Sequence, residues 1–221
     1  MKQIAFILSI LFPSLLFYGC GLDNYDEPQS VLYGKVTYNG ESIGVRGTAE
    51  KVQMQLYQDG YELKTSIPVC VTQDGSFQAV LFDGVYKLIH RDNNGPWVNK
   101  RDTVIITVKG STACEYPVTP YYLIRNESFT VSGNNLKATC NLEQITAGRT
   151  ITSVFLIINK TAFVDDVSSV SRVSISNPKD VSNILIEMNL SARTESVLYA
   201  LIGVQMSGVS DILFSKIEKI R

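Results

Sequence analysis

The chain has 221 residues, of which 45% are apolar and 19% are charged. These proportions are typical of globular proteins and exclude disordered, collagenous and coiled-coil chains. The 20 basic and 21 acidic residues give a formal net charge of -1, which argues against nucleic-acid binding because no basic surface is available for phosphates. The sequence holds a single histidine, so few arrangements for acid–base or metal catalysis are available.

The first residues have the pattern of an export signal. Lys2 precedes a mostly apolar run, from residue 4 to 17, which is too short for a membrane span and suits a signal-peptide core. Gly19 then stands directly before Cys20, and the pair resembles a loose bacterial lipobox. We therefore expect a signal peptide over residues 1–19 and acylation of Cys20. The alternative is an ordinary signal peptide followed by a chance cysteine.

Acyl chains on Cys20 would be the only membrane attachment, because no other stretch approaches the roughly 20 apolar residues of a transmembrane helix. Residues 20–30 are polar, contain Pro28 and show no apolar period, which predicts a flexible lipidated tether. Several acyl chains on one cysteine anchor a protein firmly. We expect a firmly tethered envelope protein that faces the cell surface, because acidic residues follow Cys20.

Three further cysteines, Cys70, Cys114 and Cys140, allow at most one disulfide within the chain. Cys70 and Cys114 form the expected pair, because both fall in the same predicted domain. The alternative is three buried thiols that pack as small hydrophobic side chains. The spacing excludes a CxxC metal or redox motif.

Residues 31–121 are predicted to form a first β-sandwich. Asn39-Gly40 is a strong hairpin signal because both residues tolerate positive φ. Residues 52–57 largely alternate polar and apolar side chains, as a strand with one buried face does. No segment carries a helical apolar stripe. The predicted strands cover residues 32–38, 52–57, 68–71, 76–82, 85–90 and 103–108.

Residues 122–221 are predicted to form a second β-sandwich. Pro120 imposes an extended conformation at the boundary. Seven short strands in about 100 residues match an immunoglobulin-like or fibronectin-like sandwich. The predicted strands cover residues 128–132, 136–142, 150–158, 170–176, 184–190, 197–205 and 212–217.

The first domain resembles the transthyretin-like, carboxypeptidase-regulatory-like β-sandwich. The resemblance lies in Gly34-x-Val36, Gly40, Ile43, Asp74-Gly75-Ser76-Phe77 and Gly84-x-Tyr86. The whole chain is similar to a family of two-domain lipoproteins from Bacteroidota, through the lipobox and residues 22–28, 81–86, 95–97 and 118–122. That resemblance implies two tandem sandwiches, glycan-utilisation loci, and an outer-membrane transporter complex as partner. It implies no catalytic or binding residue.

A search for catalytic patterns yields no catalytic residue, metal site or cofactor. His90 is the only histidine, so nucleophilic triads and multi-histidine metal sites lack partners. The carboxylates are scattered, with no spacing that marks a catalytic pair. Asp165 and Asp166 lack the spacing of a calcium loop, and we expect them in a solvated loop.

The segment from Arg91 to Trp97 is the candidate ligand-binding loop. Sugar C–H faces stack on aromatic rings, and sugar hydroxyls need polar partners; Trp97 would supply the ring, and Arg91, Asn93 and Asn94 the polar groups. The alternative, which we favour for this loop, is that Gly-Pro-Trp packs back over the sandwich end.

A second modification is predicted at Thr103. Asp102-Thr103-Val104 resembles the O-glycosylation motif of Bacteroidota envelope proteins. The alternative is that Thr103 simply begins a strand.

Three functions follow from these patterns. The first, which rests mostly on the family resemblance, is a lipid-anchored, surface-exposed accessory protein of the outer membrane for glycan binding or uptake, with a polysaccharide and a transporter complex as partners. The second is a structural or adhesive envelope protein that acts through exposed edge strands. The third is a glycan hydrolase whose carboxylates pair only in space. We expect a non-enzymatic protein.

Overall fold

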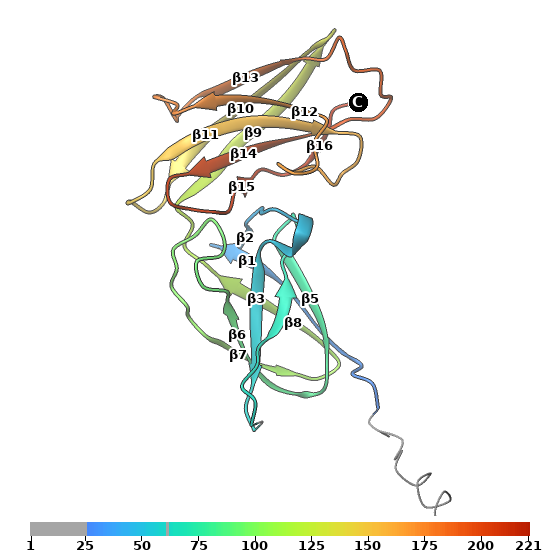
Figure 1. Cartoon of the computed structure of the whole chain (residues 1–221), viewed down its shortest axis with the longest axis vertical. Helices are drawn as coiled ribbons and strands as arrows, with labels where there is room; N and C mark the ends of the chain where they lie inside the picture. The colour runs from blue at the N-terminus through green and yellow to red at the C-terminus, as the bar shows by residue number, and fades with distance from the viewer. Residues whose placement is uncertain (1–25, 61) are drawn as a thin grey trace, which may run out of the picture.

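The computed structural model describes residues 26–60 and 62–221. These residues form sixteen β-strands and one short 3-10 turn, Thr48–Glu50, with no α-helix among them. The strands build two β-sandwiches in tandem, one on each side of a narrow junction (Figure 1). The sequence-based prediction of two tandem all-β sandwiches is therefore confirmed.

The first sheet of the N-terminal domain is built around β1. This strand pairs antiparallel with β5 along one edge and parallel with β8 along the other. Hairpin partner β2 extends the sheet at the end of β1. The strands are β1 (Ser30–Tyr38), β2 (Glu41–Ser42), β5 (Ser76–Leu81) and β8 (Ser111–Pro117).

The second sheet packs against the first and has the order β4-β3-β6-β7. Alternate side chains of its strands, such as Met54, Leu56, Tyr86 and Leu88, are buried between the two sheets. This alternation is what a strand with one buried face requires. The strands are β3 (Gln53–Gln58), β4 (Ile67–Cys70), β6 (Gly84–His90) and β7 (Val104–Val108).

The Asn39-Gly40 turn joins β1 to β2 as predicted. Asn39 has φ 50° and Gly40 has φ 81°, and Tyr38 pairs with Glu41. Two central residues with positive φ define the type I′ turn that suits the twist of a hairpin.

Strand β8 is absent from the sequence-based prediction. Of its seven residues only Tyr116 is buried, so its apolar pattern is weak. Its pairing with β1 is parallel, and parallel neighbours lack the short turn that identifies a hairpin. Gly34 makes the close approach possible, because a Cβ there would lie 2.1 Å from the carbonyl oxygen of Cys114.

The C-terminal domain is a sandwich of two sheets, with orders β13-β10-β9 and β12-β11-β14-β15, and β16 also pairs with β14. Its first, second and fifth strands share one sheet, as in immunoglobulin-like Greek keys. The strands are β9 (Tyr122–Ser132), β10 (Asn135–Gln144), β11 (Ile151–Asn159), β12 (Ser171–Ser176), β13 (Ile184–Asn189), β14 (Tyr199–Met206), β15 (Leu213–Phe214) and β16 (Glu218–Lys219).

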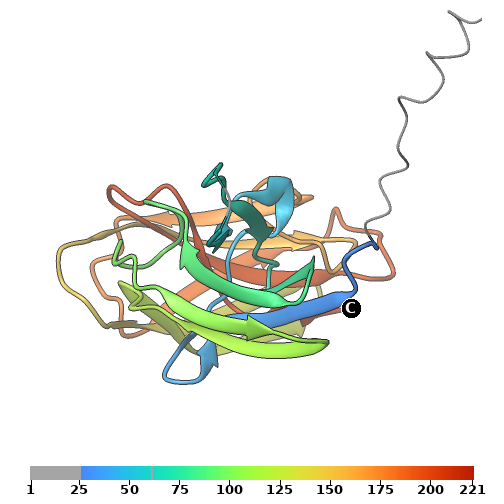
Figure 2. The same cartoon turned by 90° about the horizontal axis from the view of Figure 1, so that it is seen from below.

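The two domains share a junction with a common apolar core. A single cluster of buried side chains includes Ile43 and Val45 from the first domain and Leu123 and Leu213 from the second. The backbone N–H of Phe214 donates to the carbonyl oxygen of Gly44 at 3.0 Å, which links the domains by a β-bridge. Viewed from below, the N-terminal domain lies in front of the C-terminal sandwich (Figure 2).

The expected Cys70–Cys114 disulfide is not formed, and this prediction is corrected. Cys70, Cys114 and Cys140 are all free thiols. Cys70 lies on β4 of one sheet and Cys114 on β8 of the facing sheet. Burial raises the pKa of Cys114 to about 11, so this thiol behaves as a small packed side chain, as the alternative interpretation expects.

The predicted signal peptide (residues 1–19) and the predicted acylation site, Cys20, lie outside the described residues. Within the described part of the chain, no helix is long and apolar enough to cross a membrane. Thr103, the predicted glycosylation site, is exposed directly before β7.

Candidate functional site

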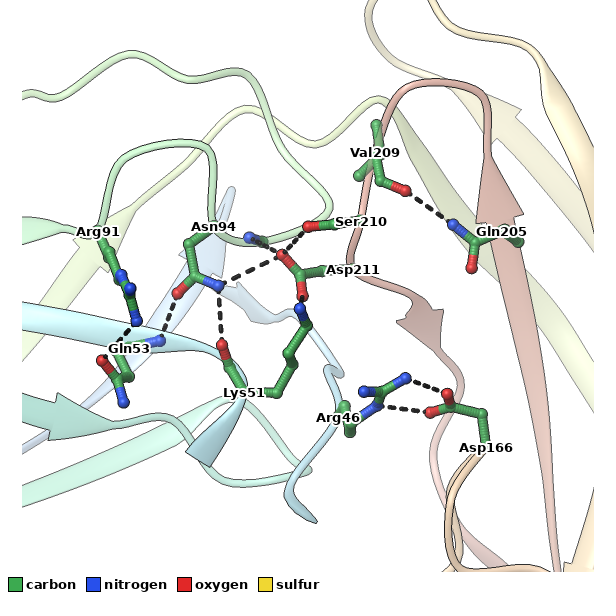
Figure 3. A network of polar contacts seen from close by, with 11 residues as sticks. Arg46, Lys51, Gln53, Arg91, Asn94, Asp166, Gln205, Val209, Ser210 and Asp211 are labelled. Carbon is green, nitrogen blue, oxygen red and sulfur yellow. Dashed lines mark hydrogen bonds and ion pairs between the residues drawn. The ribbon is translucent and has the colours of Figure 1, made fainter. Parts of the chain in front are cut away.

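The loop from Arg91 to Trp97 belongs to the N-terminal domain and lies at the domain junction, where it forms hydrogen bonds to the C-terminal domain. Asn94 is buried at its centre. The Asn94 side-chain oxygen accepts from the backbone N–H of Gln53 at 2.7 Å, and its amide donates to the carbonyl oxygen of Lys51 at 2.8 Å. The same amide donates to Asp211 Oδ2 of the C-terminal domain at 3.3 Å (Figure 3).

Asp211 is the C-terminal half of this connection and is 1% exposed. Its Oδ2 accepts from the backbone N–H of Gly95 at 2.8 Å and from Ser210 Oγ at 3.0 Å. Lys51 Nζ lies 3.6 Å from Oδ1 and balances the buried charge. We call Lys51, Asn94, Gly95 and Asp211 the interdomain latch.

The loop that carries Asp211 is itself held in place. Gln205 Nε2 in β14 donates to the carbonyl oxygen of Val209 at 2.7 Å (Figure 3). This hydrogen bond holds the turn from Gln205 to Val209, directly before Ser210 and Asp211. The Asp211 carboxylate therefore reaches the N-terminal domain from a fixed turn.

Trp97 is not a sugar platform in this structure, because its ring is only 3% exposed. The ring packs against Gly95, where a Cβ would lie 2.1 Å from it, and edge-on to His90 with a centroid distance of 6.2 Å. The alternative prediction, that Gly-Pro-Trp folds back and packs, describes the observed arrangement. His90 is buried too, with Nδ1 2.8 Å from the Arg91 carbonyl oxygen and Nε2 3.2 Å from that of Lys100.

The remaining residues of the predicted loop line a small surface hollow. Arg91 and Asn93 are exposed, whereas Asn94 is the buried latch residue. The structure brings all three to one hollow of about 400 Å³, together with Glu50 and Ser210. Arg91 Nη1 donates to Gln53 Oε1 at 3.2 Å, so part of its donor capacity is already used.

Asp165 and Asp166 form a second interdomain connection, so the prediction of a solvated loop is wrong. Arg46 pairs with Asp166, with Nε 2.7 Å from Oδ1 (Figure 3). Thr48 Oγ1 donates to Asp165 Oδ2 at 2.6 Å. Burial raises the pKa of Asp165, but hydrogen bonds from Thr48, Ser168 and Val167 outweigh it and leave that pKa below its ordinary value.

A cleft of about 750 Å³ lies at the junction of the two domains. Five stretches of the chain, three from the N-terminal domain and two from the C-terminal domain, form it, and several of its side chains are charged or polar. We call it the interdomain cleft. Its lining includes Lys35, Glu41, Ser42, Ile43, Asp74, Ile124, Arg125, Asn126, Glu127, Phe214, Lys216 and Ile217.

Arg125 is fixed at the edge of the interdomain cleft. Its Nε donates to Glu143 Oε2 at 2.8 Å, and its Nη1 pairs with Glu41 across the junction. These hydrogen bonds raise the pKa of Arg125 above its ordinary value. The neighbouring Asn126 has φ 53° at the point where β9 and β10 change register. Such bulges re-aim side chains and often border functional sites.

Asp74 stands on the opposite side of the interdomain cleft as an ionised carboxylate. Burial raises its pKa, but hydrogen bonds from Ser76 and Thr72 outweigh that effect, so the pKa is below its ordinary value. Its Oδ1 accepts from Thr72 Oγ1 at 2.7 Å and from the Ser76 backbone N–H at 3.1 Å.

Sequence reasoning missed the interdomain cleft and the latch partner Asp211. The cleft residues come from five stretches of the chain, between Lys35 and Ile217, and no motif marks them as a binding site. One signal pointed to the cleft. Asn126 interrupts the alternation of polar and apolar side chains in β9, just before residue 128, where the sequence predicts the strand to begin.

The fold and the junction define a two-domain protein of tandem β-sandwiches. The chain belongs to the DUF3823 family: residues 30–119 match the "Protein of unknown function (DUF3823) N-terminal domain" and residues 122–219 match the "Domain of unknown function (DUF3823_C)". The resemblance to a two-domain family is thereby confirmed. No curated protein matches the chain.

Crystal structures of related proteins have the same fold. A DUF3823 family protein from Parabacteroides merdae is 40% identical, with a TM-score of 0.84 over 89% of this chain and 100% of that chain. One from Bacteroides ovatus is 34% identical, with a TM-score of 0.79 over 86% and 98%. A candidate carbohydrate-binding protein from Bacteroides uniformis is 16% identical, with a TM-score of 0.74 over 88% and 100%.

Proposed function

We propose that this protein is a non-enzymatic, lipid-anchored protein of the outer membrane that binds a glycan in the interdomain cleft. The observation that carries the proposal is the size and place of the cleft. A volume of about 750 Å³ falls within the range of small-ligand sites, and such sites favour domain interfaces.

The chemistry of the interdomain cleft suits a sugar. Lys35, Asn126 and Lys216 supply hydrogen-bond donors at an exposed rim, and Glu127 supplies acceptors. Ile217 is partly exposed and offers apolar contact to sugar C–H faces. The B. uniformis relative described as a candidate carbohydrate-binding protein shares this two-domain fold, which is consistent with the proposal.

Binding is favoured over glycan hydrolysis by the state of two of the three carboxylates in the interdomain cleft, Asp74 and Glu41. A glycosidase needs one carboxylic acid with a raised pKa as general acid. Asp74 has a lowered pKa, and Glu41 is committed to an ion pair with Arg125. We therefore assign this cleft to binding.

The lipid anchor and the partner are parts of the same proposal. Gly19-Cys20 supports acylation, and Asp26 to Gln29 are exposed ahead of β1, as a tether requires. An anchored protein at the cell surface would hold its glycan beside an outer-membrane transporter complex and assist uptake. A structural or adhesive role through protein partners is the alternative outcome.

Calorimetry with a soluble form of residues 21–221 tests glycan binding. Titration with a panel of dietary and host polysaccharides should give binding that Lys216→Ala and Glu127→Ala each weaken about tenfold, a loss of about 1.4 kcal/mol. Lys179→Ala, an exposed lysine on the β12–β13 loop, serves as the matched control and should bind normally. Absence of binding across the panel would favour the structural alternative.

Metabolic labelling with a palmitate analogue tests the anchor. The wild-type chain should be labelled and Cys20→Ser should not. Protease added to intact cells should cut a surface-leaflet protein, so an uncut protein would contradict the proposed leaflet.

A further inference from the structure

Exposed apolar side chains gather at the end of the N-terminal domain where the chain enters. Leu63, Val80, Phe82 and Val85 are 83%, 55%, 49% and 54% exposed. Single exposed apolar residues are ordinary, whereas a group of them in one place indicates an interaction surface. We call these four residues the entry-end patch.

Strand registers place the entry-end patch around the end of the sandwich where β1 begins, with Val80 on the outer face of one sheet and Val85 on the outer face of the other. Ser30, the first residue of β1, pairs with Leu81, between Val80 and Phe82. Ser30 Oγ also bonds to Asp83, which precedes β6 and Val85. Figure 1 shows this end of the domain farthest from the C-terminal sandwich, with β1 starting there.

Leu63 belongs to the same end, because β3 ends there. Gln58, the last residue of β3, pairs with Tyr86 near the start of β6. Leu63 follows in the β3–β4 loop, which projects past the sheet at this end (Figure 1).

Charged side chains of both signs border the patch, and Glu62 is exposed directly beside Leu63. Lys64 and Lys109 are exposed at this end, and the Gly110 carbonyl next to Lys109 accepts from the Val31 backbone N–H at 2.9 Å. Asp59 is paired with Lys87, and Asp83 accepts a hydrogen bond from Ser30. Lysines beside apolar side chains are typical of residues that insert into a membrane interface.

We propose that the entry-end patch rests in the headgroup region of the bilayer that holds the lipid anchor. The inference depends on the proposed lipidation. Nine residues lie between Cys20 and Ser30, and the ten steps from one to the other span at most about 35 Å, so an acylated Cys20 keeps this end close to lipid. Seating there directs the C-terminal domain and the interdomain cleft away from the membrane.

Tryptophan reporters on vesicles test the seating. Residues 20–221 in a Cys70→Ser background are coupled through Cys20 to a maleimide lipid, so the test does not depend on natural acylation. The vesicles contain phosphatidylethanolamine, phosphatidylglycerol and a headgroup spin-labelled quencher lipid. Phe82→Trp reports on the patch, and Phe163→Trp, an exposed aromatic position on the C-terminal domain, is the matched control.

Quenching should be about threefold stronger for Phe82→Trp than for Phe163→Trp, and Leu63→Ser added to Phe82→Trp should reduce it. The native Trp97 is buried and contributes equally to both proteins. Equal quenching at the two positions would overturn the proposal. So would a dimer in sedimentation that Phe82→Ser dissolves, because the patch would then bind a second copy. Calorimetry on the soluble form separates these outcomes from a failure of glycan binding.

Discussion

Asp211 of the C-terminal domain accepts a hydrogen bond from the backbone N–H of Gly95 in the N-terminal domain at 2.8 Å. Both groups are buried, so neither can replace its partner with water. Gly95 has φ 119°, a conformation that favours glycine. The two sandwiches are therefore connected by a specific polar contact as well as by apolar packing.

Loss of the Asp211 carboxylate should destabilise the whole protein. Asp211→Ala leaves the Gly95 N–H, the Asn94 amide and the Lys51 ammonium without their acceptor, at a cost of about 3 kcal/mol. Urea unfolding measures this loss. Glu218→Ala removes an exposed carboxylate of the same domain and should stay within about 0.5 kcal/mol of wild type. Equal stability of the two variants would contradict the latch.

Trp97→Ala should act on stability and not directly on glycan binding. Removing a buried ring of this size costs about 3–5 kcal/mol, which a urea titration detects. Below the unfolding transition, the affinity for a bound glycan should be unchanged, because Trp97 lines neither hollow. If Trp97→Ala had normal stability but lost glycan binding, the result would instead support the prediction that the Trp97 ring stacks on a sugar.

Acid should weaken the junction through Asp165. Its pKa is lowered in the folded protein, so its contribution is fully present above the ordinary value of 3.8 and is lost as pH falls through the lowered folded pKa. The free energy of unfolding of Asp165→Asn should therefore lie below that of wild type at pH 7, and the difference should shrink as the pH falls below 3.8. A difference that stays constant with pH would exclude this linkage.

The thiols should react slowly in the folded protein. Burial raises the pKa of Cys114 to about 11, and burial with the nearby Glu127 charge raises that of Cys140 to about 12. Reaction proceeds through the thiolate, so a thiol reagent at pH 8 should label the less buried Cys70 first and the other two on unfolding. Cys70→Ser should remove the faster phase. A Cys70–Cys114 peptide in a non-reducing digest would contradict the free thiols.

Gly34→Ala should be among the most damaging small substitutions. The added Cβ would meet the Cys114 carbonyl oxygen and the Phe77 ring, separating β1 from β8 at a cost of about 3 kcal/mol or more. Gly133→Ala adds the same methyl group in open space at φ 56° and should cost only about 1–2 kcal/mol. Thermal melting of both variants compares them, and similar losses would refute the close-contact explanation.

The fold was predictable where the chain pairs with its near neighbours. Asn39-Gly40 specifies a hairpin, and the alternation in residues 52–57 specifies a half-buried strand, so both follow from local chemistry. Strand β8 was not predictable because its partner β1 lies about 80 residues earlier. The β9 bulge at Asn126 hid the first part of that strand, which begins at Tyr122.

The candidate site was far less predictable. The composition of the Arg91–Trp97 loop indicated polar contacts and an aromatic ring, but not whether a ligand or the protein itself would occupy them. Asn94 and Trp97 proved to contact Asp211 and His90, which lie 117 and 7 residues away. Arg125 and Glu41 meet only because two separate domains pack together, and no local pattern records that packing.

The parallel pairing of β1 with β8 determines how the N-terminal domain would respond to mechanical load. The chain enters the domain at Ser30, at the start of β1, and leaves it after Pro117, at the end of β8. A pull between these two points acts along the strands, so the β1–β8 hydrogen bonds are stretched together in shear instead of opening one after another. The domain therefore has the geometry of a force-resistant spacer between its entry end and the C-terminal sandwich.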